Sequence, residues 1–372
     1  MKRPCNPLRS GDKAAAVNLL QSIKDHPGLL ERLDRLRVDP LAETPVLFAK
    51  IKLLWQCNLS CVFCRRPSAT PPMSRERVLT LLDALRDRGL RKIHYSGGEI
   101  FLHPDILPIL EASCSRGLQV NFTSNGTLIG KDLARAIVET GVHSLSLSLD
   151  SHDPRRHDAL RGQKGAFKKT VRALEYLLRY RKKGPVLRIN TVVSRENFSD
   201  LDQMHDFLTG LDREIIWKLI PVDSPSKKLL LRAEQAEELL TLRERWSSEE
   251  DSPETPVPSL TPRSLTRGLY AGGYYGSHPC YMPWLHLFVD PAGFAYPCCM
   301  TRGKIPALGR LEQDSLSDIL EGDRMQKLRM SLAGGIPLDI CRHCDDFIEE
   351  NALIESEIHS MKGGNSHEQK AI

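Results

Sequence analysis

Three cysteines, at positions 57, 61 and 64, constrain the fold and function of this chain more than any other sequence feature. Their spacing is C-x3-C-x2-C. The preceding residues Lys50 to Leu54 alternate and are rich in aliphatic side chains, which predicts a β-strand with the cysteines on the loop that leaves its end. Thiolates on one short loop can converge on one metal centre. A structural zinc site uses four closed ligands, whereas three local thiolates suit an iron–sulfur cluster with one open iron.

A Gly-Gly-Glu segment ends the next predicted strand, Arg91 to Tyr95. Gly97 and Gly98 let the backbone approach a ligand closely, and Glu99 offers a carboxylate. The segment follows the cysteine loop by one strand–helix–strand unit, and with this combination the sequence resembles the radical S-adenosylmethionine (SAM) superfamily. One departure is Ile100, which stands where many relatives have proline.

The resemblance implies a set of cofactors and a chemistry. In that family the three cysteines, here Cys57, Cys61 and Cys64, hold a [4Fe-4S] cluster whose fourth iron chelates SAM, and the Gly-Gly-Glu segment contacts the methionine part of SAM. One electron from the cluster releases a 5′-deoxyadenosyl radical, which abstracts a hydrogen atom from the substrate. The resemblance therefore also implies a one-electron donor such as flavodoxin or ferredoxin.

Strands and helices alternate from about residue 48 to residue 222, which predicts an α/β fold with a parallel sheet and at most six repeats. We expect a partial (β/α)6 TIM-like barrel with its site at the carboxyl ends of the strands. The predicted strands are residues 50–54, 91–95, 118–123, 143–149, 186–193 and 215–220.

Small polar side chains follow the third and fourth predicted strands. By the family resemblance, Ser148 and Asp150 face the SAM ribose, and Asn125 lies near the adenosyl group. Arg161 stands in an Asp-x-x-Arg-Gly segment whose arginine often pairs with the SAM carboxylate in relatives. The alternative for Arg161 is a residue that caps a surface helix.

The C-terminal part carries a second set of cysteines around a predicted hairpin at Pro291 to Gly293 and a predicted helix over residues 316–332. Paired cysteines fit a zinc ribbon. Their order also resembles the SPASM/twitch extension of radical SAM enzymes, in the form with a single auxiliary [4Fe-4S] cluster. Three roles are left open for Cys299: it replaces Cys298 as a ligand, stays unbound, or donates a hydrogen atom to a substrate radical. The implied ligands are Cys280, Cys298, Cys341 and Cys344.

Composition sets the broad class and the compartment. The chain has 372 residues, 41% hydrophobic and 27% charged, which is typical of a folded globular protein. Its formal charge of +5 is not gathered in a basic block, so we expect no nucleic-acid partner. The N-terminus resembles no signal peptide, and no stretch of about 18 apolar residues occurs, so we expect a cytoplasmic protein with no membrane contact.

The predicted organisation has five parts, and the polar segment 363–370 in the last of them is expected to be disordered. The parts are an N-terminal helical extension (1–47), a radical SAM core (48–222), a helix and linker (223–278), an auxiliary cluster domain (279–347) and a tail (348–372).

Three functions remain open at this stage. The leading hypothesis is a radical SAM oxidoreductase of a small polar metabolite, in which a fully ligated auxiliary cluster accepts an electron, as attributed to relatives such as 2-deoxy-scyllo-inosamine dehydrogenase. The alternative is a maturase or epimerase of a ribosomally made peptide; its weak point is an N-terminal extension too short for a peptide-recognition domain. A non-catalytic metal-binding adaptor is the third, and the intact cysteine and Gly-Gly-Glu motifs argue against it.

Overall fold

A curved sheet organises the molecule. The computed structural model describes residues 19–64, 70–182, 184–222, 227–246, 261–266, 273–342, 344 and 346–368. In this part of the chain the strand order is β6-β5-β4-β3-β2-β1-β7-β8-β9. Strands β1 to β6 are all parallel, which confirms the predicted partial barrel. They are β1 (Phe48–Lys52), β2 (Lys92–Ser96), β3 (Gln119–Ser124), β4 (Ser144–Ser148), β5 (Val186–Val193) and β6 (Ile216–Pro221).

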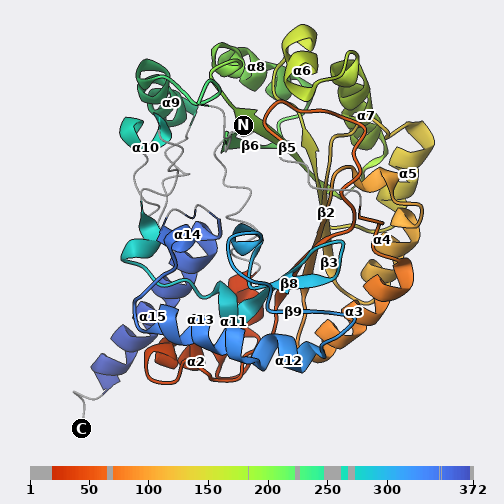
Figure 1. The fold of residues 1–372 in the computed structure, drawn as a ribbon. Coiled ribbons are helices and arrows are strands. Elements are labelled where there is room, and N and C mark those ends of the chain that lie inside the picture. The colour runs from red at the N-terminus through yellow and green to blue at the C-terminus, as the bar shows by residue number, and fades with distance from the viewer. Residues whose placement is uncertain are drawn as a thin grey trace.

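The connecting helices lie on the outside of the ring that the sheet forms (Figure 1). Successive strand residues point to opposite faces, and the outward-pointing residues of β1 to β5 are buried, for example Ile51 and Phe122, as is Trp217 on β6. The alternate set points inward, and we call it the inner face. The covering helices are α3 (Arg75–Asp87), α4 (Ile106–Ser115), α5 (Lys131–Glu139), α7 (Ala166–Tyr180) and α8 (Leu201–Leu211).

Local sequence explains the helix boundaries. Helix α3 begins after Ser74, whose hydroxyl accepts a hydrogen bond from the Arg77 N–H at 3.3 Å, as an N-cap does. Its residues Val78, Leu82 and Leu85 are buried at helical spacing and pack against the outward face of the sheet. Helix α9 (Ala233–Trp246) follows β6, and most of the predicted linker after it lies outside the described residues.

The C-terminal part continues the sheet of the barrel. Strand β7 (His286–Val289) pairs in parallel with β1, and β8 (Phe294–Tyr296) and β9 (Gly309–Arg310) follow antiparallel. The predicted hairpin is therefore present, and Gly293 at its turn has a φ of 82°, which favours glycine. The apolar Leu287 and Val289 of β7 belong to the main core.

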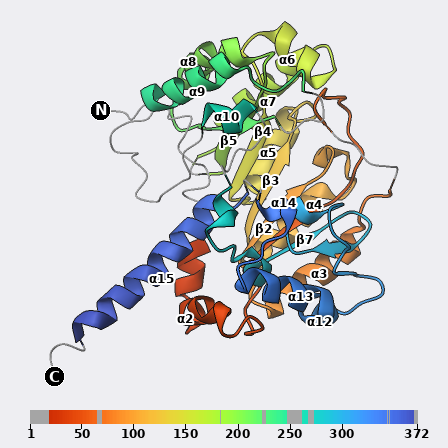
Figure 2. The same cartoon turned by 60° about the vertical axis from the view of Figure 1, so that its left-hand side comes forward.

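Two predictions about helices near the C-terminus were wrong. The single helix expected over residues 316–332 is two helices, α12 (Leu316–Glu321) and α13 (Asp323–Ala333), because Gly322 between them is extended. The expected tail contains the helix α15 (Ile348–Glu368). Its buried Ile354 and Ile358 belong to a core cluster with α2 (Leu29–Asp34), and Figure 2 shows the two helices side by side.

None of the described helices is both long and apolar enough to cross a bilayer. Short helices complete the connections between the larger elements. They are α6 (Pro154–Arg161), α10 (Pro262–Thr266), α11 (Met282–Leu285) and α14 (Asp339–Arg342), with 3₁₀ turns at Arg35–Arg37, Ile100–Leu102, Phe198–Asp200, Tyr274–Gly276 and Cys299–Thr301.

Candidate functional site

The loop with the first three cysteines leaves β1 and packs against the Gly-Gly-Glu segment that leaves β2. The Gly98 N–H donates to the Leu54 carbonyl and the Glu99 N–H to the Gln56 carbonyl, both at 2.9 Å. A Cβ added to Gly98 would lie 2.1 Å from the Gln56 oxygen, far inside van der Waals contact. Glycine is therefore required here because the backbone of the cysteine loop occupies the place of a side chain.

Glu99 ties the same segment to the end of β3. Its carboxylate has no exposed surface and accepts hydrogen bonds from the Ser124 hydroxyl at 2.7 Å, the Asn125 N–H at 2.7 Å and the Phe101 N–H at 3.2 Å. Burial raises the pKa of Glu99, and these hydrogen bonds oppose that rise. Glu99 thus holds the ends of β2 and β3 together, and its contact with SAM stays a prediction.

Asn125 extends this connection to the first cysteine. Its side-chain oxygen accepts from the N–H and the hydroxyl of Thr127, at 2.9 and 2.6 Å. Its amide nitrogen donates to the Asn58 side-chain oxygen at 2.9 Å and lies 3.9 Å from the Cys57 sulfur. The structure therefore places Asn125 beside the cysteine loop, and the predicted proximity to the adenosyl group stays open.

The other side of the cysteine loop packs against the end of α6. The Ser60 N–H donates to the Arg161 carbonyl at 3.1 Å, and the Val62 N–H donates to the Leu160 carbonyl at 3.0 Å. Gly162 has a φ of 65°, and a Cβ there would lie 2.3 Å from the Ser60 oxygen. The Arg-Gly part of the sequence motif is thus explained by a close backbone approach to the loop.

Arg161 places a fixed positive charge at the second cysteine. Its guanidinium lies 2.8 and 2.7 Å from the two carboxylate oxygens of Asp150 and 3.8 Å from the Cys61 sulfur. Asp150 is fully buried and also accepts the Val192 N–H at 2.9 Å. Burial raises the pKa of the Cys61 thiol, whereas the Arg161 charge lowers it. Ser148 lies two residues before Asp150, half-buried at the end of β4. The predicted contacts of these residues with SAM are not tested by this geometry.

The second set of cysteines surrounds one pocket. Its lining includes all four implied auxiliary ligands and apolar neighbours such as Met282 and Leu328. Within the described residues no three His, Cys, Asp or Glu side chains are close enough together to bind a single metal ion. Four thiols around a space fit the donor set of a fully ligated [4Fe-4S] cluster. These four are Cys280, Cys298, Cys341 and Cys344.

Cys299 lies apart from that lining. Its sulfur is 2.9 Å from a carboxylate oxygen of Asp346 and 3.6 Å from the ammonium nitrogen of Lys50. Lys50 belongs to β1, so this thiol lies between the auxiliary region and the barrel. The pocket is thus lined by Cys298 and by Asp346, the contact of Cys299, and the choice of Cys298 over Cys299 as the ligand stays a prediction.

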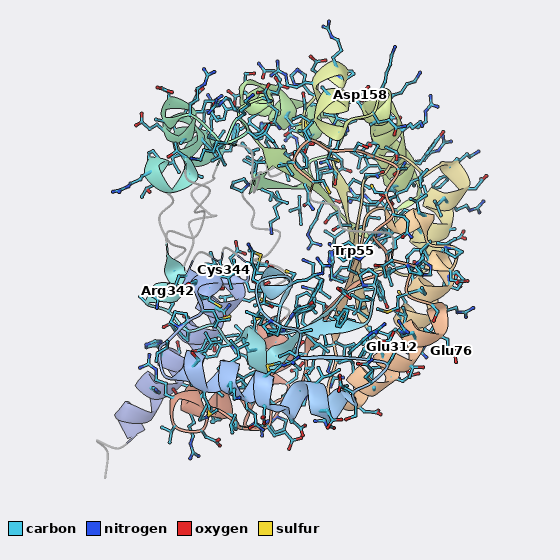
Figure 3. All side chains as sticks on the ribbon, in the orientation of Figure 1. Trp55, Glu76, Asp158, Glu312, Arg342 and Cys344 are labelled. Carbon is cyan, nitrogen blue, oxygen red and sulfur yellow. The ribbon has the colours of Figure 1, made fainter. Side chains whose placement is uncertain are left out.

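The sequence analysis missed the residues around Cys299 and near Trp55. The Lys52 nitrogen lies 4.4 Å above the centre of the Trp55 ring and the Arg302 guanidinium 4.2 Å from it, as in cation–π contacts. In Figure 3, Trp55 and Cys344 lie on opposite sides of the centre of the ring. Of the residues around Cys299, Asp346 could have been suspected from the sequence, because it lies two residues after the last cysteine.

Comparison with known proteins assigns both regions. The family model of the radical SAM superfamily matches residues 55–208, and the model of the SPASM iron–sulfur cluster-binding domain matches residues 280–345. The AdoMet-dependent heme synthase of Oleidesulfovibrio alaskensis is 31% identical over 50% of this chain and 49% of its own. The chain spans half or less of the length of this synthase and of two similar ones.

Two further similarities cover more of the chain. The PqqA peptide cyclase of Granulibacter bethesdensis is 24% identical over 79% of this chain and 78% of its own. The structure of Streptococcus suis SuiB bound to precursor peptide SuiA covers 84% of this chain and 73% of its own, with a TM-score of 0.61 and 14% identity, which shows a shared fold. The chain belongs to the radical SAM superfamily and carries a C-terminal SPASM domain, and its cofactors are accordingly SAM, a SAM-binding [4Fe-4S] cluster and an auxiliary iron–sulfur cluster.

Proposed function

We propose that this chain is a radical SAM enzyme that modifies a residue within a peptide. The observation that carries the proposal is the similarity to a PqqA peptide cyclase, which extends over 79% of the chain and thus well beyond residues 55–208. The likeness of the fold to peptide-bound SuiB agrees with it. The sequence analysis had placed the oxidation of a small polar metabolite first, and the comparisons favour its peptide alternative.

The chain's own residues hold and orient the reactive groups in this proposal. When bound, the cluster and SAM supply the radical that takes a hydrogen atom from the substrate. Cys57, Cys61 and Cys64 bind the first cluster, and the packing of Gly98 and Gly162 against their loop fixes its path. Asp150 holds the Arg161 guanidinium 3.8 Å from the Cys61 sulfur, where the guanidinium favours the thiolate form of that ligand while the carboxylate and burial oppose it.

Cys299 bears on the type of modification. A peptide epimerase needs a hydrogen donor after hydrogen abstraction, and a thiol S–H bond can provide that atom. The Cys299 thiol is held between Asp346 and Lys50, next to the inner face. A peptide cross-link needs no such donor, so loss of this thiol separates the two reaction types. Full epimerising activity of Cys299→Ala would exclude Cys299 as the donor.

The experiment that tests the function uses the reconstituted full chain with SAM and a strong reductant under anaerobic conditions. Candidate substrates are the short peptides encoded beside the gene. We expect formation of 5′-deoxyadenosine together with a change in peptide mass, and loss of both in Cys57→Ala. Cys114→Ala is the matched control, because that thiol lies on the outer helix α4 and should leave both unchanged. Stimulation of 5′-deoxyadenosine formation by small polar metabolites and by none of the peptides would contradict the proposal.

A further inference from the structure

One carboxylate lies in the lining of the pocket that the auxiliary cysteines surround. It belongs to Asp346, and the described residues of that lining include no Lys, Arg or Glu. The carboxylate accepts a hydrogen bond from the Cys299 thiol, with 2.9 Å between sulfur and oxygen, and a thiol is a weak donor. Within the described part of the chain Asp346 forms no ion pair. A negative charge therefore lies at the cluster site with little compensation.

The backbone of Asp346 is fixed to the same site at both ends of the residue. Its N–H donates to the sulfur of Cys344, one of the implied ligands, at 3.4 Å. Its carbonyl accepts from the Tyr275 hydroxyl at 2.6 Å, and the oxygen of that hydroxyl accepts from the Asn351 side-chain amide at 2.9 Å. Tyr275 also lines the pocket and is only 4% exposed. These contacts hold the residue that bears the carboxylate beside the ligand sulfurs.

The charge of Asp346 acts on most of the ligand thiols. Burial raises the pKa of three of the four implied ligands, and the negative charge of Asp346 adds to each of these rises. The three are Cys280, Cys298 and Cys344. A charge that opposes the thiolate form also opposes an electron added to the cluster that the thiolates hold, because both changes increase the negative charge at the same place.

Lys50 carries the opposing positive charge. Its ammonium nitrogen lies 3.6 Å from the Cys299 sulfur, on the other side of the contact between that sulfur and Asp346. The Cys299 charge is the main cause that raises the pKa of Lys50, burial opposes the rise, and Asp346 adds to it. Lys50 belongs to β1 and is not among the residues that line the pocket. The carboxylate, which does line it, therefore has the larger effect on the cluster.

We propose that Asp346 lowers the reduction potential of the auxiliary cluster and that Lys50 raises it by a smaller amount. An electron that enters the chain can reside on either cluster. A lower potential of the auxiliary cluster favours its residence on the SAM-binding cluster, where the reductive cleavage of SAM consumes it. This role concerns the cluster and not the substrate, so it goes beyond the proposed peptide function and holds whatever molecule the enzyme modifies.

The test is a redox titration of the full chain with both clusters reconstituted, followed by electron paramagnetic resonance. Added SAM changes the signal of the cluster that binds it, which identifies the auxiliary signal as the other one. In Asp346→Asn we expect the ratio of reduced to oxidised auxiliary cluster to rise about tenfold at a fixed potential, a shift of about 59 mV for a one-electron couple. Lys50→Gln should shift the midpoint the opposite way and by less. Asp346→Glu keeps the charge and should titrate close to the parent.

Control variants separate charge from packing. Asp87→Asn makes the same substitution at the exposed end of α3 and should leave the potential unchanged. A midpoint of Asp346→Asn at or below that of the parent would overturn the inference. Equal shifts in Asp346→Asn and Asp346→Glu would also overturn it, because they would show an effect of shape and not of charge.

Iron content is measured on every variant. If Asp346→Asn takes up less iron than the parent, Lys50→Gln decides, because Lys50 lies outside the pocket lining. A lower midpoint in that variant upholds the inference, and an unchanged or higher one overturns it. A parent without an auxiliary [4Fe-4S] signal would overturn it as well, while the peptide assay would still judge the proposed function.

Discussion

Gly98 is the residue on which the path of the first cysteine loop depends most directly. No side chain fits there, because the Gln56 and Trp55 carbonyl oxygens lie 2.1 and 2.5 Å from the position of a Cβ. Both are backbone atoms, so neither can swing away as the end of a flexible side chain would. A methyl group at position 98 must therefore move the loop that carries Cys57.

Gly98→Ala should consequently lose the SAM-binding cluster while the chain stays folded. We expect iron to fall from about eight to about four per chain, and overpacking to cost about 1–3 kcal/mol of folding free energy. Gly210→Ala is the control, because no atom lies within 4 Å of a Cβ there and its helix favours alanine. An iron content of Gly98→Ala equal to that of the parent would show that the loop tolerates the shift.

Substitutions of the adjacent residues Cys298 and Cys299 should have opposite effects on the auxiliary cluster. Cys298 lines the pocket with the other three auxiliary thiols, whereas Cys299 contacts Asp346 and Lys50. Cys298→Ala should lose the electron paramagnetic resonance signal of the auxiliary cluster, and Cys299→Ala should keep it. The reverse pattern in the two spectra would assign the ligand to Cys299.

Because of the buried His157, the free energy of unfolding should decrease as the pH falls. This residue is 1% exposed, its Nδ1 accepts the Asp150 N–H at 3.1 Å, and burial together with the Arg161 charge lowers its pKa to about 3. Because the folded pKa is below the unfolded value of 6.5, the unfolded state binds the proton more readily as pH falls from 6.5 toward 3. The contribution is complete above pH 6.5 and is lost through that window.

His157→Gln should therefore flatten the dependence of unfolding free energy on pH. Glutamine retains an acceptor for the Asp150 N–H but does not titrate. Linkage gives a loss of about 2 kcal/mol in the parent between pH 7 and pH 5 from this group, and that part should vanish in the variant. Urea unfolding at the two pH values measures it, and equal losses in both proteins would assign the acid sensitivity to other groups.

Helix α15 is an element that the sequence analysis did not predict. Its residues Ile354 and Ile358 are 1% and 4% exposed, and they pack with Leu33 and other apolar side chains of a second core cluster. The polar composition of residues 363–370 suggested a tail, whereas the helical spacing of the apolar Ile354 and Ile358 before them favours a packed helix.

Ile354→Ala should destabilise the protein by about 2–4 kcal/mol through a cavity in that cluster. Glu357→Ala is the control on the same helix, because its partly exposed ion pair with Lys24, at 2.8 Å, is worth less than about 1 kcal/mol. The urea midpoints of the two variants and the parent provide the measurement. A destabilisation by Ile354→Ala no larger than that of Glu357→Ala would mean that α15 is not docked.

Strands were the elements best predicted from sequence, because alternation reflects one buried and one inward face. The prediction for β5 agrees with the structure at both ends, and the other strands agree within about two residues. The pairing of β7 with β1 could not be predicted, since it joins residues more than two hundred positions apart. Ion pairs of the C-terminal part with α3 and its C-cap share this property, for example Arg88 with Glu321 at 2.6 Å, and Arg77 with Glu312; Glu312 is labelled in Figure 3.

The same contrast holds for the site at the scale of the whole molecule. Cysteine spacing and the Gly-Gly-Glu segment are local, so the sequence analysis named the residues that the structure then brings together around one loop. The contacts of Cys299 with Lys50 and Asp346 join residues from distant parts of the chain, and the pairing of β7 with β1 brings those parts together.

The central claim is that this chain holds two iron–sulfur clusters, one bound by each of the two sets of cysteines. Its most direct test is the iron and sulfide content of anaerobically reconstituted protein, beside a variant with Cys57, Cys61 and Cys64 all changed to Ala. The account predicts about eight irons per chain in the parent and about four in the variant. About four irons in the parent and none in the variant would contradict it, and would leave the four C-terminal cysteines without a cluster.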